Sequence, residues 1–273
     1  MVTHKIRKPA VAGQFYPSLE KELTAQIESF IDKKQDKRDV IGCVLPHAGY
    51  IYSGSVAVKT ASRINIKDRI ILLGPNHTGY GTAFSIMSEG SWQTPLGDVE
   101  IDNQLAKQLL SHSKALENNY AAHLYEHSLE VELPILQYFK KDFKIVPITI
   151  MSQEANVLKE VGENIAEVIQ NLKLEGSVML VASSDMTHYE PKITAAKKDK
   201  EAIEAILKLD EDGLIKKIRQ LNISMCGWAP VVLMLAAAKR LGAAQAELIE
   251  YQTSGDVTGE EASVVGYAGI IVY

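Results

Sequence analysis

The sequence predicts an α/β fold: one domain with a central, mostly parallel sheet flanked by helices. Short runs of uninterrupted apolar residues, at 70–73 and 178–182, lack the alternation of a half-exposed strand. Such runs are typical of strands that are buried on both faces in a parallel sheet. Amphipathic stretches of helical period alternate with these runs along the chain. No repeat or low-complexity linker divides the 273 residues, so residues 1–273 are expected to form a single domain.

The composition excludes several classes of protein. Hydrophobic residues make up 46% and charged residues 23% of the chain, which is ordinary for a globular protein. A formal charge of −5 offers no basic field for nucleic acid, and no apolar run has the length of a membrane span. Residues 1–7 lack the apolar core of a signal peptide. With only Cys43 and Cys226 as thiols, we expect a cytoplasmic protein without disulfides.

The first half of the chain contains two strands that each stop at a proline. Pro46 ends one and Gly74-Pro75 ends the other, since proline cannot continue the hydrogen bonds of a central strand. The expected elements are a helix that Ser18 caps, a solvated loop at 32–39, a strand at 40–45, a helix at 55–63 and a strand at 69–73.

The second half continues the alternation. Asp102 is placed to cap a helix, and one apolar stripe runs through 155–172. Loop residues at 254–259 separate the last two strands, which predicts a hairpin at the sheet edge. The expected elements are a strand at 82–87, a loop at 92–98 entering a short strand, helices after Asp102 and near Pro134, a strand at 144–150, a helix at 155–172, a strand at 177–182, helices at 191–209, 211–221 and 231–241, and strands at 247–253 and 264–272.

Two histidines directly follow the two proline-terminated strands. His47 follows the first, and Asn76-His77 follows the second among glycines. If the strands are parallel neighbours, both imidazoles lie at the same sheet edge, where α/β proteins bind ligands. Two histidines with open coordination positions suit iron, copper or zinc. The alternative, two unrelated loop histidines, stays open.

Further polar residues follow the strand at 177–182. Asp185 and His188 are three residues apart, so a single turn brings them to one face, where the carboxylate would fix the tautomer of an acid or base histidine. The alternative is a turn in which Asp185 caps local backbone. Glu126-His127 is either a pair that supports a site or a polar helix start, and His112 and His123 have no supporting context.

Cys226 lies at the expected start of a helix, next to Gly227. The helix dipole there is expected to lower the thiol pKa, which suits a metal ligand or a nucleophile. The alternative is a small buried hydrophobe, the role that we assign to Cys43.

Taken together, five segments resemble the Memo family, whose prokaryotic members are called AmmeMemoRadiSam system protein B. They are Pro46–Gly54, Gly74–His77, Glu126–Pro134, Ser183–Tyr189 and Cys226-Gly227. The resemblance implies a fold similar to the class III extradiol dioxygenases, which use non-haem iron(II). It implies that His47 and His77 bind the metal, with Cys226 in the third position where those enzymes have a carboxylate.

The resemblance also implies the surroundings of that site. Asp185 and His188 would be the nearby acid/base pair. The expected pocket residues are Phe15, Tyr52, Asn76, Glu126 and His127; Phe15 stands where the family often has tryptophan. The system name implies partners that are AMMECR1-like and radical SAM proteins.

Three functions stay open from the sequence. The first is a metal-dependent redox or dioxygenase-like protein that uses iron(II) or copper, with zinc as the other candidate, on an unidentified small molecule or peptide. A thiolate ligand is soft and favours copper(I), zinc or iron in a different electronic state from that of the dioxygenases. The second is a binding module that holds an anionic or phosphorylated peptide in a vestigial pocket. The third is a hydrolase or transferase with Cys226 as nucleophile and His188 and Asp185 as base and orienting group.

Overall fold

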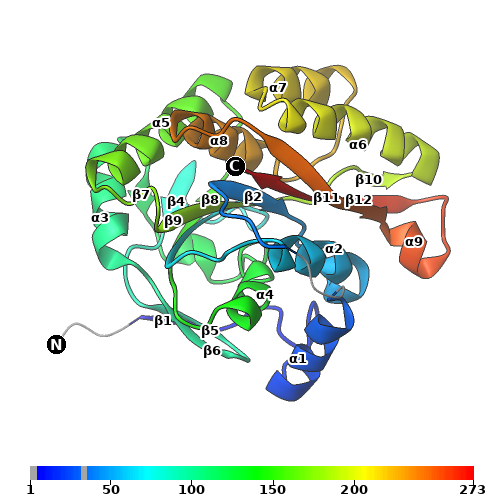
Figure 1. The fold of residues 1–273 in the computed structure, drawn as a ribbon, viewed down its shortest axis with the longest axis horizontal. Coiled ribbons are helices and arrows are strands. Elements are labelled where there is room, and N and C mark those ends of the chain that lie inside the picture. Colours follow the sequence, from blue (N-terminus) through cyan, green and yellow to red (C-terminus); the bar gives the residue numbers. More distant parts are fainter. Residues whose placement is uncertain (1–4, 32–35) are drawn as a thin grey trace.

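The structure is a computed structural model that describes residues 5–31 and 36–273. Within these residues a nine-stranded mixed sheet lies at the centre, and a small three-stranded sheet lies to one side (Figure 1). The strands are β1 (Ile6–Arg7), β2 (Gly42–Leu45), β3 (Arg69–Pro75), β4 (Phe84–Ile86), β5 (Ser91–Thr94), β6 (Gly97–Glu100), β7 (Glu117–Asn118), β8 (Lys144–Ile150), β9 (Val178–Ser183), β10 (His188–Glu190), β11 (Ala246–Thr253) and β12 (Val264–Val272). The helices are α1 (Glu20–Ser29), α2 (Tyr50–Ser62), α3 (Asn103–His112), α4 (Glu132–Phe139), α5 (Ala155–Asn171), α6 (Lys192–Leu207), α7 (Glu211–Gln220), α8 (Trp228–Arg240), α9 (Ser254–Thr258) and the 3₁₀ helix η1 (Ala121–His123).

The large sheet has a parallel centre and antiparallel flanks. Its order is β10-β12-β2-β9-β3-β8-β4-β7, and β11 pairs with the other side of β12. Strands β2, β9, β3 and β8 are parallel, whereas β12 and β4 run antiparallel to their neighbours β2 and β8. Leu45 pairs with Ser183, and Leu73 pairs with Ala182. The carboxyl ends of β2, β3 and β9 therefore meet at one edge, and the predicted α/β class is confirmed.

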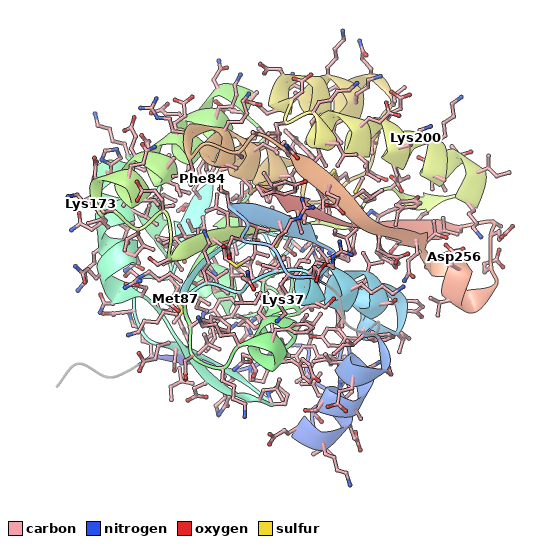
Figure 2. The ribbon with its side chains drawn as sticks, in the orientation of Figure 1. Lys37, Phe84, Met87, Lys173, Lys200 and Asp256 are labelled. Atoms are coloured by element: carbon pink, nitrogen blue, oxygen red, sulfur yellow. The ribbon has the colours of Figure 1, made fainter. Side chains whose placement is uncertain are left out.

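Helices bury both faces of the sheet. In β3, Ile71 and Leu73 belong to the core shared with α5 and α8, while Ile70 and Leu72 belong to the core on the opposite face. Each fully buried aliphatic side chain contributes about 1.5–3 kcal/mol, so the apolar run of β3 stabilises both layers. Charged side chains such as Lys173 and Lys200 lie at the periphery (Figure 2).

Helices α5 and α8 pack closely where one of them lacks a side chain. A Cβ added to Gly162 on α5 would lie 2.4 Å from the carbonyl oxygen of Leu233 on α8. Glycine at this position lets the two backbones approach, which the apolar stripe alone did not predict.

A buried ion pair fastens the N-terminal segment to the body of the protein. Arg7 and Glu130 are almost fully buried and form a salt bridge. The Arg7 guanidinium lies 4.3 Å from the centre of the Trp92 ring and donates to the His123 carbonyl at 2.9 Å. The Tyr16 hydroxyl donates to Glu130 at 2.7 Å, so each charged group of the pair has several polar partners.

Several sequence-predicted boundaries are wrong. Helix α2 begins at Tyr50 rather than at residue 55, because Gly54 is accommodated inside the helix, where an added Cβ would lie 2.8 Å from the Phe30 ring. Ser18 does not cap α1; the cap position is Leu19, without a side-chain hydrogen bond. The segment at 92–98 is not a loop but most of the β5–β6 hairpin.

Other predictions at the level of elements are confirmed. Asp102 caps α3 by accepting from Leu105 N–H at 2.9 Å, and β8 spans the predicted 144–150. β11 and β12 form the predicted edge hairpin, but their connection contains the short helix α9. The charged run at 32–39 falls partly outside the described residues. No helix among those that the structure describes is long and apolar enough to cross a membrane.

Candidate metal centre

Three potential metal ligands meet at the edge formed by β2, β3 and β9. His47 follows β2, His77 follows β3, and Cys226 precedes α8. One donor atom from each lies within 4.8 Å of the others. The His47 and His77 ring centres are 5.3 Å apart, and Cys226 Sγ lies 3.3 Å from His47 Nε2. The structure thus brings together the three residues that the sequence singled out.

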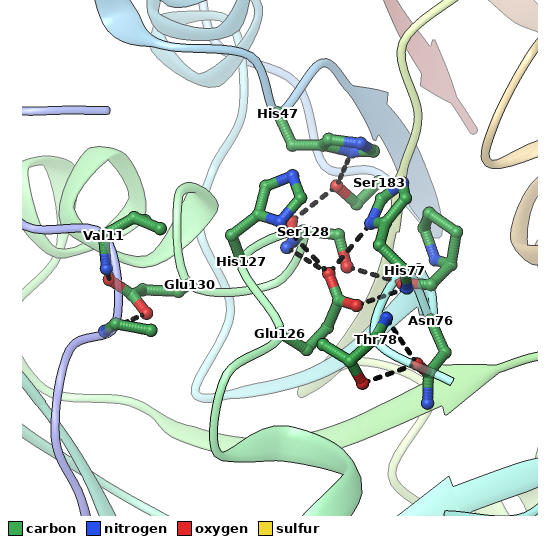
Figure 3. Close-up of polar contacts among 12 residues, drawn as sticks. Val11, His47, Asn76, His77, Thr78, Glu126, His127, Ser128, Glu130 and Ser183 are labelled. Carbon is green, nitrogen blue, oxygen red and sulfur yellow. Dashed lines mark hydrogen bonds and ion pairs between the residues drawn. The ribbon is translucent and has the colours of Figure 1, made fainter. Parts of the chain in front are cut away.

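The tautomer of His47 is set by a serine at the end of β9. Nδ1 of His47 lies 2.7 Å from Ser183 Oγ (Figure 3). The Ser183 hydroxyl donates its single proton to the Ser128 carbonyl at 2.7 Å, so it accepts from His47 Nδ1–H. Burial, together with His127 and His77, lowers the pKa of His47 well below its usual range. His47 is therefore neutral, and Nε2 presents its lone pair beside Cys226.

Glu132 lies behind this hydrogen bond. Its Oε1 is 2.9 Å from Ser183 Oγ, its Oε2 has no hydrogen-bond partner, and the side chain is fully buried. Burial raises the pKa of Glu132 well above its usual range, with a smaller contribution from Asp185. A protonated Glu132 carries the proton that the second lone pair of Ser183 can accept, which satisfies Ser183 and leaves Oε2 of Glu132 as the one atom of this group without a partner.

The tautomer of His77 is set by Glu126. The Glu126 carboxylate accepts from the backbone N–H of His77, from His77 Nδ1–H at 3.0 Å and from Ser128 N–H at 2.9 Å (Figure 3). Burial by itself would raise the pKa of Glu126, but the bonds from His77 and Ser128 outweigh it and lower the pKa to about 2. Glu126 is thus a charged support that leaves Nε2 of His77 open, as in many metal sites.

The thiol of Cys226 differs from the sequence-based expectation. It accepts a hydrogen bond from Asp185 N–H at 3.3 Å. Burial and the Asp185 carboxylate raise the pKa of the Cys226 thiol, because desolvation outweighs the helix dipole. A bound cation would favour the thiolate instead, so the position suits a ligand better than a free nucleophile.

The predicted Asp185–His188 pair is not joined by a hydrogen bond among the described residues. Asp185 accepts from His47 N–H at 2.8 Å, and burial raises its pKa to about 6. His188 Nδ1–H donates to the Ser224 carbonyl at 3.0 Å, and His188 N–H donates to Ser224 Oγ at 2.8 Å. Ser224, which is distant in the sequence, thus fixes the tautomer of His188, a role that we had expected Asp185 to have. Asp185 instead connects the end of β9 to the end of β2.

A cavity of about 740 Å³ opens beside the donor cluster. Phe15, Tyr52 and His127 line it, as expected. The ring of His127 stacks on that of His77, with centres 4.7 Å apart and planes 22° apart. The remaining lining residues are His47, Ala48, Gly49, His77, Asp185, His188, Tyr189, Ser254, Thr258, Glu260, Ser263, Val265 and Tyr267.

Two predicted pocket residues do not line this cavity. Glu126 is fully buried behind His77. Asn76 folds onto its own loop, where its Oδ1 accepts from Thr78 N–H and Gly79 N–H at 3.0 Å each. It lines a smaller cavity of about 240 Å³ on the Cys226 side of the site. Tyr189 and Tyr267 were missed, although Tyr189 directly follows His188 in the sequence.

Comparisons with known proteins found a matching family model and relatives of similar length. A family model described as "Memo-like protein" matches residues 7–271. The chain is 45% identical to a MEMO1 family protein of Methanosarcina acetivorans and 44% identical to one of Aquifex aeolicus, in each case over 98% of this chain and 99% of the relative.

The match to a solved structure is more distant. The crystal structure of an uncharacterized protein from Escherichia coli K12 matches with a TM-score of 0.56 and 15% identity, over 84% of this chain and 98% of that one. This match shows the fold alone, and similarity to the extradiol dioxygenases stays a prediction. The family model and the full-length relatives agree with the five sequence segments, and the chain belongs to the Memo-like family.

Proposed function

We propose that this protein is a metal-dependent redox protein in which His47, His77 and Cys226 bind iron or copper. The observation that carries the proposal is the convergence of two imidazoles and one sulfur, all within 4.8 Å, beside a cavity of small-molecule size. Donors of this kind suit iron, copper and zinc. Membership of the Memo-like family is consistent with the site but names no activity.

The surroundings of the histidines fit this donor set. Ser183 and Glu126 occupy the Nδ1 atoms of His47 and His77, so both rings offer Nε2 without rearrangement. The outer groups are buried and hydrogen-bonded, which holds the rings in place and strengthens their basicity. A metal bound here would supply one-electron chemistry to a substrate in the cavity.

Residues of the chain would manage protons in the cavity. His188 is bound through Nδ1 to Ser224, so its Nε2 is the atom that can take up or deliver a proton. The Asp185 carboxyl, which accepts from His47 N–H, is a second group that can exchange a proton in the cavity. Both residues line the cavity and stand beside the donor cluster, which suits acid and base roles toward a bound substrate.

The alternative of a cysteine nucleophile has less support. Burial and the Asp185 carboxylate raise the pKa of the Cys226 thiol, and the atom beside Cys226 Sγ is Nε2 of a neutral His47. A nucleophilic cysteine needs a lowered thiol pKa.

Elemental analysis tests the proposal directly. Protein purified without oxygen or chelator is compared with His47→Ala, Cys226→Ser and the control Cys43→Ala, whose side chain is buried in β2. We expect near-stoichiometric iron or copper in the wild type and the control, and its loss in the two site variants. A folded wild type that carries no transition metal, or zinc alone, would reject the redox proposal, since zinc has no redox chemistry.

A further inference from the structure

The cavity has a second wall that the metal proposal does not use. Tyr52 comes from α2, Tyr189 from β10 and Tyr267 from β12, and Phe15 completes the aromatic lining. All three tyrosines line the same cavity, and burial raises the pKa of the Tyr267 hydroxyl. Three elements far apart in the sequence thus supply aromatic surface to one space.

The charges around this wall are negative or neutral. Among the described residues that line the cavity there is no lysine or arginine, whereas Asp185 and Glu260 are both present. Lys192 pairs with Asp256 at 2.9 Å and, at 2.8 Å, with Glu261, the residue that follows Glu260. Apart from its histidines, the cavity therefore offers a phosphate or carboxylate no cationic side chain, and its carboxylates favour a cation.

Tyr189 is held at the cavity in an unusual backbone conformation. Its φ is +58°, in the left-handed region that bulky residues rarely adopt, and the pairing of β10 with β12 is irregular between His188 and Glu190. The two hydrogen bonds from His188 to Ser224 brace the preceding residue. Tyr189 is nevertheless 78% exposed as a residue, so its own burial does not offset this strain. Local strain of this kind gathers at ligand-binding sites.

We propose that this cavity binds a small organic amine, with its apolar body against Tyr52, Tyr189 and Tyr267 and its ammonium group facing Glu260. Aromatic faces attract cations through their quadrupoles, and an exposed carboxylate adds a modest ion pair. A volume of about 740 Å³ accommodates a molecule of this class. The role of the amine as a substrate rests on the proposed function, whereas its binding does not require the metal.

Three probes of similar size and different charge test the inference: phenethylamine, phenethyl alcohol and phenylacetate. Each is titrated calorimetrically at pH 7 into the wild type and into Cys226→Ser, and the metal content of every sample is measured. We expect phenethylamine to bind about 3-fold or more tightly than the alcohol, and phenylacetate to bind most weakly to Cys226→Ser.

Two variants with matched controls locate the binding site. Tyr189→Ala is expected to weaken phenethylamine about 5-fold, whereas Tyr125→Ala, which removes an exposed tyrosine outside the cavity lining, has no effect. Glu260→Gln is expected to weaken the amine about 3-fold and leave the alcohol unchanged, with the exposed Glu117→Gln as control.

The outcomes separate this inference from the metal proposal. Phenylacetate binding to Cys226→Ser as tightly as the amine would overturn the inference, as would undetectable amine binding or binding insensitive to both Tyr189→Ala and Glu260→Gln. Amine binding in samples that contain no metal, wild type included, would support the inference and reject the proposed function alone. Iron or copper in the wild type, together with no preference for the amine over the alcohol in Cys226→Ser, would support the proposed function and overturn the inference.

Discussion

Replacing Glu126 with glutamine tests how the protein holds one of its candidate ligands. Three N–H groups converge on the two oxygens of this buried carboxylate: the backbone and Nδ1 of His77, and the backbone of Ser128. A glutamine has the same size but only one acceptor oxygen. If that oxygen keeps the Oε1 position, the amide NH₂ faces the His77 backbone N–H. If the amide turns over, the two bonds to Oε1 are lost instead.

The size of the expected loss in stability follows from the three N–H groups that donate to Glu126. At least one buried N–H loses its acceptor in Glu126→Gln, which costs about 1–3 kcal/mol of folding free energy. His77 also loses the negative charge that supports its ring, and changes in such supporting groups typically reduce metal affinity about 10- to 100-fold. We therefore expect weaker metal binding and lower stability in the same variant.

Cobalt(II) titration is a suitable assay, because the absorption of a cobalt–thiolate bond reports binding at Cys226 without any activity measurement. Urea unfolding of the metal-free protein gives the stability change. Glu89→Gln is the control, since Glu89 forms an exposed pair with Lys5 and its loss should cost less than about 1 kcal/mol. Unchanged cobalt affinity and stability in Glu126→Gln would refute the assignment of Glu126 as the support of His77.

Three further predictions concern buried polar groups. In Arg7→Met, Glu130 stays buried without its cation, so urea unfolding should show a loss of about 3–5 kcal/mol. Burial, with a contribution from Arg7, lowers the pKa of His123 from 6.5 to about 3. The neutral, buried His123 therefore contributes its full stability above pH 6.5. As the pH falls from 6.5 toward 3, the free energy of unfolding decreases by up to about 1.4 kcal/mol per pH unit, because the unfolded chain binds the proton first. His123→Leu should remove this part of the pH dependence of stability. Glu132→Gln can still donate to Ser183 and should keep cobalt affinity within about 3-fold, whereas Glu132→Leu removes the donor and should weaken cobalt binding about 10-fold or more.

Each of these predictions has an outcome that contradicts it. A loss below about 1 kcal/mol in Arg7→Met would mean that the remaining donors to Glu130 suffice. His112→Gln, a change at a surface histidine paired with Glu167, is the control for the pH series. Equal slopes of stability against pH in His123→Leu and the wild type would contradict the burial argument. Equal cobalt affinity in the two Glu132 variants would show that its proton does not orient Ser183.

The sequence predicted the fold where one physical signal dominated. Apolar runs without alternation identified β3 and β9, and proline stops located the edge where His47 and His77 meet. It failed where tertiary packing decided the local structure. The helix that the sequence predicts begins only after Gly54, yet Gly54 lies inside α2, where the Phe30 ring occupies the place of a side chain.

The sequence indicated which residues lie at the candidate site, but not their hydrogen-bond partners or their pKa shifts. Cys226 was identified from its place before a helix, but the sequence could not reveal that burial and Asp185 raise its pKa. The partner of His188 is Ser224, 36 residues away, and only the fold brings them together. Long-range contacts of this kind leave no signal in local spacing.

X-ray absorption spectroscopy of the metal-loaded protein tests the central claim most directly, because it detects the atoms bound to the metal. We predict one sulfur at about 2.3 Å, the usual length for a zinc–thiolate bond and a guide for copper and iron, together with nitrogen ligands of imidazole type. The sulfur contribution should disappear in Cys226→Ser and remain in Cys43→Ala. A metal surrounded only by nitrogen and oxygen in the wild type would contradict the two-histidine, one-cysteine centre.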